Sequence, residues 1–98
     1  MANDNNKKEI KIELTPEVAG GHYSNMAFIA HGSNEFFLDF IAMAPNQGPK
    51  LQSRIIMSPE HAKNLLFALR DNIAKYEQTF GEIVRKTPIN TTDNGFTA

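Results

Sequence analysis

The longest periodic segment of the chain is residues 59–80, where apolar residues recur every three or four positions. This spacing is typical of an amphipathic helix that buries one stripe. Ser58 is suited to cap the first free N–H groups, Pro59 to begin the helix, and Gly81 to follow its last turn. We therefore predict a helix of about six turns. Its stripe, which we expect to pack on the rest of the chain, consists of Ala62, Leu65, Leu66, Leu69, Ile73, Tyr76 and Phe80.

Four shorter segments precede this helix, and each reads as a β-strand. The first alternates apolar and polar residues, and the others are rich in aromatic and β-branched residues, which favour strands. Turn-forming clusters separate the last three segments. The predicted strands are residues 10–14, 23–30, 35–44 and 51–57. The fold class is therefore α+β, with a four-stranded antiparallel sheet, residues 10–14 at an edge, followed by one long C-terminal helix.

The register of the last two strands follows from the turn between them. If that turn centres on Asn46 and Gln47, Leu38 lies opposite Ile55 and the neighbouring pair is Asp39 with Arg54. The register of residues 23–30 stays open, because a change of one residue in the preceding hairpin loop moves every side chain to the other face.

In this arrangement nothing packs against one of the two faces of the sheet. Phe37, Ile41 and Ile56 are too apolar for a freely solvated face, and Phe67 and Ala74 form a second narrow strip on the flank of the helix. One helix covers one sheet face. We therefore expect these five residues to form an interface and the protein to be a homodimer.

Asp39 stands alone as a carboxylate within an apolar strand. A charge in such a place needs a partner, so we expect a structural ion pair with Arg54 across the sheet. The alternative is a carboxylate that faces a ligand, with its pKa raised by burial. The chain offers no second group for catalysis beside it, so we expect no enzyme and no catalytic residues.

Composition narrows the possible functions further. There is no cysteine, which excludes disulfides and thiolate metal sites, and His22, His31 and His61 show no metal-binding spacing. We expect no metal and no cofactor. The net charge of −1 predicts no general attraction to polyanions. No apolar run is long enough to span a membrane.

The two ends of the chain are polar and differ from the middle. We expect residues 1–8 and 86–98 to be disordered and residues 9–85 to form a single domain. The first residues lack the apolar core of a signal peptide, so we expect a cytoplasmic protein.

A set of short motifs is spread along the middle of the chain: Tyr23-Ser24-Asn25, Glu35-Phe36, Asp39-Phe40, Ser53-Arg54, residues 58–63, Tyr76-Glu77 and Phe80-Gly81. Together these motifs resemble a family of small bacterial proteins, domain of unknown function 3467. The resemblance runs from about Gly21 to Ile83 and implies a bacterial, soluble, stand-alone domain with no assigned activity. Asp39, Arg54, His61 and Lys63 fall on its motif positions without a known role.

Two functions remain in view. The first is a non-enzymatic interaction or regulatory module that self-associates and can also bind a protein partner. The alternative is a single-stranded nucleic-acid-binding domain, because four strands followed by a helix is the order of the repeat in PUR-type domains. Phe37 and Arg54 could then serve stacking and phosphate contacts. The net charge of −1 disfavours this alternative.

Overall fold

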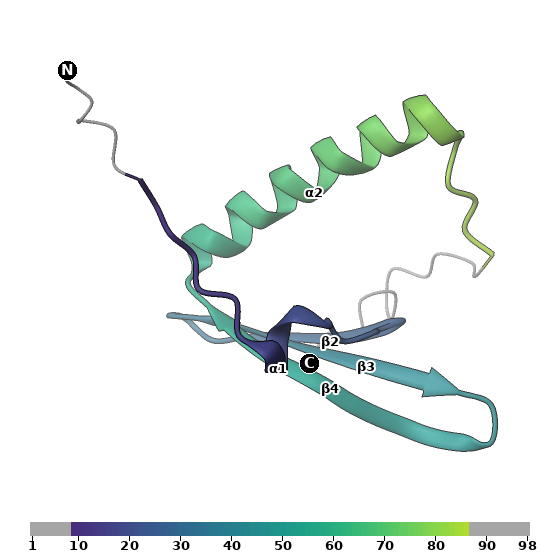
Figure 1. Cartoon of the computed structure of the whole chain (residues 1–98), viewed down its shortest axis with the longest axis horizontal. Coiled ribbons are helices and arrows are strands. Elements are labelled where there is room, and N and C mark those ends of the chain that lie inside the picture. The colour runs from purple at the N-terminus through teal and green to yellow at the C-terminus, as the bar shows by residue number, and fades with distance from the viewer. Residues whose placement is uncertain (1–8, 87–98) are drawn as a thin grey trace.

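The structure is a computed structural model that describes residues 9–86, in which one antiparallel sheet is followed by one long helix (Figure 1). The strands lie in the order β2-β3-β4, each beside its neighbour in sequence. The chain is therefore α+β, as predicted. Its elements are α1 (Pro16–Ala19), β2 (Met26–His31), β3 (Phe36–Ala44), β4 (Gln47–Met57) and α2 (Pro59–Phe80).

The predicted edge strand at residues 10–14 is wrong, so the sheet among the described residues has three strands and not four. Ile10, Ile12 and Leu14 are largely exposed, with Ile12 at 85%. The backbone N–H groups of Val18 and Ala19 bond to the carbonyl of Thr15, which begins α1 directly after this segment. Alternation of apolar and polar residues gives an extended segment one apolar side, but it does not supply a neighbouring strand with which that segment can pair.

The register of β3 and β4 is the predicted one, with Leu38 opposite Ile55 and Asp39 opposite Arg54. The turn itself differs, because β4 already begins at Gln47, and Asn46 takes the left-handed φ of 67° that this residue type tolerates. Two irregularities in the ladder, at Phe40/Ile41 and Ala42/Ala44, offset the earlier turn and restore the predicted pairs.

The pairing of β2 settles the register that the sequence left open. Ile29 lies opposite Leu38, and Phe28 lies opposite Asp39. Because side chains alternate along a strand, Ile29 and Leu38 share one face of the sheet and Phe28 and Asp39 share the other. We call the face that α2 overlooks the inner face. The inner face includes Ile29, Phe36, Leu38, Phe40, Ile55 and Met57, and the opposite, outer face includes Phe28, Phe37, Asp39, Ile41, Arg54 and Ile56.

Ser24 and Asn25 hold the start of β2 to β3. The Asn25 side-chain amide donates to the Met43 carbonyl at 3.0 Å and accepts from the Met43 N–H at 2.9 Å. The Ser24 hydroxyl lies within hydrogen-bond distance of the carbonyls of Met26 and Ile41. These side chains thus continue the ladder beyond its last backbone pair, which gives this motif a structural role.

The ends of α2 are the predicted ones. The Ser58 hydroxyl oxygen accepts from the His61 N–H at 3.1 Å, and Pro59 occupies the first turn. Gly81 follows the last turn with φ 99° and ψ 165°, a conformation that side-chain-bearing residues rarely adopt. Cap and glycine together account for both boundaries of the helix.

The predicted packing of α2 on its own sheet is wrong. No residue of α2 is buried, and among the described residues the buried apolar side chains are Leu38, Ile41 and Met57. Only Ser58 separates β4 from α2. After this short connection α2 reverses the direction of β4 and runs back above the inner face, but it rises away from the sheet toward its C-terminal end (Figure 1).

Replacing Gly81 with alanine is expected to destabilise α2 by about 1–3 kcal/mol, because a Cβ strains the conformation at φ 99°. Thermal unfolding followed by far-ultraviolet circular dichroism measures this loss. Gly20→Ala is the matched control, since Gly20 has a helical φ of −74° and open space around the added Cβ. Equal midpoints for the two variants would contradict the role of Gly81.

Candidate functional site

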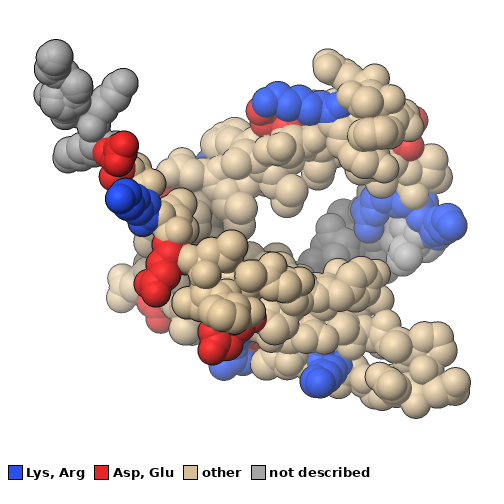
Figure 2. Space-filling model, in the orientation of Figure 1, with Lys and Arg blue, Asp and Glu red and all other residues tan. Residues whose placement is uncertain are grey.

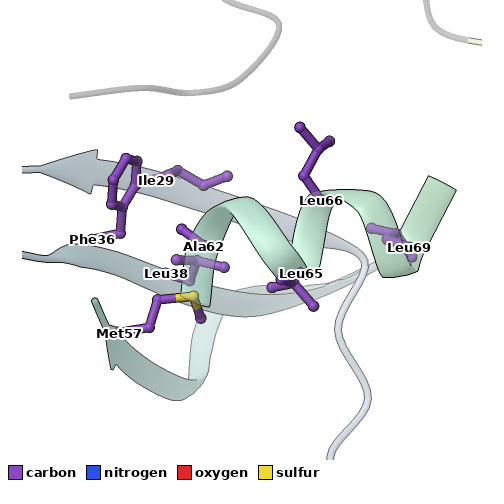
Figure 3. A pocket seen from close by; sticks show the side chains of 8 residues that line it. All are labelled: Ile29, Phe36, Leu38, Met57, Ala62, Leu65, Leu66 and Leu69. Atoms are coloured by element: carbon purple, nitrogen blue, oxygen red, sulfur yellow. The ribbon is translucent and has the colours of Figure 1, made fainter. Parts of the chain in front are cut away.

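The inner face of the sheet and the first half of α2 form the two walls of an open apolar cleft (Figure 3). The cleft has a volume of about 250 Å³. This lies below the roughly 300–1,000 Å³ of pockets that enclose small ligands. Its lining, shown as sticks in Figure 3, is Ile29, Phe36, Leu38, Met57, Ala62, Leu65, Leu66 and Leu69.

The cleft has no charged or hydrogen-bonding side chain in its lining. In Figure 2 the helix above the cleft and the sheet below it are tan, and so uncharged, where they face each other. Proton transfer or ion binding needs polar groups at the site. What this cleft can do is bury another apolar surface.

The apolar stripe of α2 continues past the cleft into its second half. Ile73, Tyr76 and Phe80 extend it, and Phe80 is 72% exposed. The rings of Tyr76 and Phe80 contact each other with centroids 4.9 Å apart. None of these three residues lines the cleft, so the cleft gives this half of the helix no surface to pack on.

The outer face carries the ion pair of Asp39 and Arg54. Arg54 donates from Nε to Oδ1 at 2.7 Å and from Nη2 to Oδ2 at 2.8 Å, which is a two-point contact. The hydrogen bond from Arg54 is the main cause that lowers the pKa of Asp39, and the same bond raises the pKa of Arg54. This direction is opposite to that of a ligand-facing carboxylate with a raised pKa.

The pair is less buried than the apolar strand around Asp39 suggested. The side chain of Asp39 is 19% exposed and that of Arg54 is 57% exposed. The guanidinium reaches the surface because Arg54 lies on β4, an edge strand of the sheet. A shallow hollow of about 320 Å³ surrounds the pair and is lined also by Phe28, Ala30 and Phe37.

The five predicted interface residues lie on two separate surfaces. Phe37, Ile41 and Ile56 are on the outer face, where Ile41 is buried and Ile56 is exposed. Phe67 and Ala74 are exposed on α2, which stands over the inner face. The cleft was not predicted as a site because the stripe of α2 was expected to pack on the protein's own sheet. The sequence signal that could have identified the cleft as a site is the apolar stripe of α2.

The three histidines lie far apart in chain position and environment. His22 precedes β2, His61 lies in the first turn of α2, and the ring of His31 contacts that of Phe36 with centroids 5.5 Å apart. Within residues 9–86 no group of three or more histidine or acidic residues is placed to hold a metal ion. In the same range no helix has the length and apolar character to cross a membrane.

Replacing Asp39 with asparagine is expected to lower the melting temperature at neutral pH. Because the pKa of Asp39 is lowered in the folded protein, the charged pair stabilises the fold above the unfolded pKa of about 4. That stabilisation is lost as the pH falls through the lower folded value. The difference in melting temperature between the wild type and Asp39→Asn should therefore shrink between about pH 5 and pH 2.

Arg54→Ala and the double variant complete a cycle for this pair. The double variant should lose less stability than the two single losses combined, since either change alone already breaks the contact. Additive losses, or a difference for Asp39→Asn that stays constant with pH, would show that the pair contributes no coupling.

No curated protein and no solved structure matches this chain. A family model does match, over residues 1–85, and its description is protein of unknown function (DUF3467). The match covers all of the sheet, the cleft and α2. It also agrees with the motifs of the sequence analysis, and the chain therefore belongs to the DUF3467 family.

Proposed function

We propose that this protein is a non-enzymatic interaction module that acts as a homodimer, with the cleft and the stripe of α2 as its contact surface. The observation that carries the proposal is the stripe itself. Seven apolar residues of one helix face are at least partly exposed, and the residues across the cleft are apolar as well. Apolar surface of this extent on a soluble protein marks a contact with another molecule.

The energetics support a second subunit. Each large side chain of the stripe gains roughly 2 kcal/mol when it is buried. The three buried side chains of the described residues are a small core for a chain of 98 residues, and short chains depend on oligomerisation where their own core is small. A dimer that covers the stripe thus adds most of the burial that the single chain lacks.

The chemistry of the described surface supports a module without catalysis. Asp39 and Arg54 are the groups with a shifted pKa, and each neutralises the other. The cleft brings no nucleophile, acid or base together. We place the module in the bacterial cytoplasm, because a chain without cysteine lacks the disulfides with which small secreted domains are stabilised.

Light scattering behind a sizing column, with the protein at tens of micromolar, measures the oligomeric state. We expect twice the chain mass of 11.0 kDa. Leu69→Glu should weaken the dimer on the order of thirtyfold or more, because it places a charge in the contact. Gln78→Glu is the matched control on the exposed side of α2 and should leave the mass unchanged. A monomeric wild type would contradict the proposal.

The single-stranded nucleic-acid alternative rests on the outer face. Phe28 and Phe37 lie beside Arg54 in the hollow there, and aromatic rings with a nearby cation are the groups that stack on bases and hold phosphates. Against it, both carboxylate oxygens of Asp39 already bond to Arg54. The net charge of −1 adds no counterion release.

Titration of a labelled single-stranded oligonucleotide mixture separates the two functions. The dimer module predicts no binding tighter than about 10 μM at moderate salt. Phe37→Ala and Arg54→Ala are the informative variants, with Phe67→Ala on α2 as the control. Tighter binding with a steep salt dependence, abolished by the first two variants alone, would favour the nucleic-acid function.

A further inference from the structure

We propose that two copies associate about a two-fold axis near residue 71, with their α2 helices antiparallel, so that apolar side chains from the second half of each α2 enter the cleft of the other copy. This geometry rests on the homodimer proposed above and specifies how it is built. The occupant of the apolar cleft is thus a second copy of this chain, and the side chains that enter come from residues 73–80.

The spacing of the apolar stripe is the observation from which we infer that the two α2 helices are antiparallel. Positions 62, 66, 69, 73, 76 and 80 follow steps of four, three, four, three and four residues, which is the apolar seam of a heptad repeat. The series reads the same in both directions about position 71. An antiparallel partner centred there therefore places Ala62 opposite Phe80, Leu66 opposite Tyr76, and Leu69 opposite Ile73.

Each of these contacts occurs twice, as a two-fold axis requires, because residue i of one copy meets residue j of the other and the reverse. The sizes also match. The smallest residue of the stripe, Ala62, meets the large ring of Phe80, while Leu69 and Ile73 in the middle are of similar size. Alternation of small and large residues across a contact is how packed helices interdigitate.

The position of the cleft along α2 favours contact between the first half of the helix in one copy and the second half of the helix in the other. Its walls are the inner face of the sheet and the first half of α2, and its lining ends at Leu69. The second half, with Ile73, Tyr76 and Phe80, lies beyond those walls and is exposed. An antiparallel partner brings its second half beside this first half, into the cleft. A parallel partner would place the two second halves together and leave both clefts empty.

The opposite side of α2 fits a position in water. Asn64, Asp71 and Gln78 follow one another at intervals of seven residues on that side, and all three are exposed. Asp71 Oδ2 forms an ion pair with Nζ of Lys75 at 3.1 Å, four residues along the same surface. The helix thus presents one apolar seam and one polar back, as a helix in a two-fold contact does.

Spin labels on the polar back measure the orientation directly. The natural chain has no cysteine, so Asn64→Cys, Asp71→Cys and Gln78→Cys each carry one label per copy. In the antiparallel dimer the labels at 71 are level, whereas those at 64 or at 78 are displaced along the axis by about 21 Å, from fourteen residues at 1.5 Å each. Pulsed dipolar spectroscopy should give its shortest distance at 71 and equal, longer distances at 64 and 78.

Four other results would overturn either the geometry or the dimer. Equal distances at all three positions indicate parallel helices, and a minimum at 64 or 78 indicates a different axis. Either result refutes the antiparallel exchange and leaves the homodimer standing. A dimer mass without any measurable distance between labels would place the two α2 helices far apart. This result would also refute the antiparallel exchange and leave the homodimer standing. A chain mass of one copy with no distance refutes the homodimer itself.

A cycle of alanine variants gives a second readout that does not depend on labels. Leu66 and Tyr76 lie ten residues apart on one helix, about 15 Å, so they contact each other only across two copies. Leu66→Ala and Tyr76→Ala should change the dimer dissociation constant non-additively, by about threefold or more. Phe67→Ala replaces Leu66→Ala in the control cycle and should be additive within about twofold. Equal coupling in both cycles would contradict the pairing.

Discussion

The connection between β4 and α2 is the constraint on which the rest of the structure depends. Only Ser58 lies between the two elements, and its hydroxyl is occupied in capping the helix. The helix starts at the end of β4 and runs back above the inner face, but it diverges from the sheet toward its C-terminal end. From this follow the open cleft, the exposed stripe of α2 and the small core of the single chain. We propose that a second copy buries what this geometry exposes.

Local features of the fold could be predicted from the sequence. The boundaries of α2 depend on Ser58, Pro59 and Gly81, whose effects act within one helical turn. The pairing of Asp39 with Arg54 depends on alternation within one hairpin, and it was correct although two irregularities shifted the turn. These features needed no knowledge of how distant elements pack.

The features that could not be predicted involve partners for apolar surfaces. Alternation at residues 10–14 suggested a strand, yet α1 begins directly after it and the segment stays outside the sheet. The stripe of α2 indicated a buried helix face without saying in which chain the other surface lies. An interface on the outer face and on Phe67 and Ala74 stays a prediction, whereas the apolar cleft between the inner face and α2 was not predicted. Periodicity identifies a face, but it does not identify what covers that face.

Amide hydrogen exchange of α2 as a function of protein concentration tests the central claim most directly. If a second copy covers the stripe, amides between Leu65 and Tyr76 should become protected as concentration rises through the dissociation constant of the dimer. The amides of the β2–β3 ladder should change less, because their hydrogen bonds lie within one chain. Exchange of α2 that is fast and independent of concentration would contradict the account, since the helix would then have no partner.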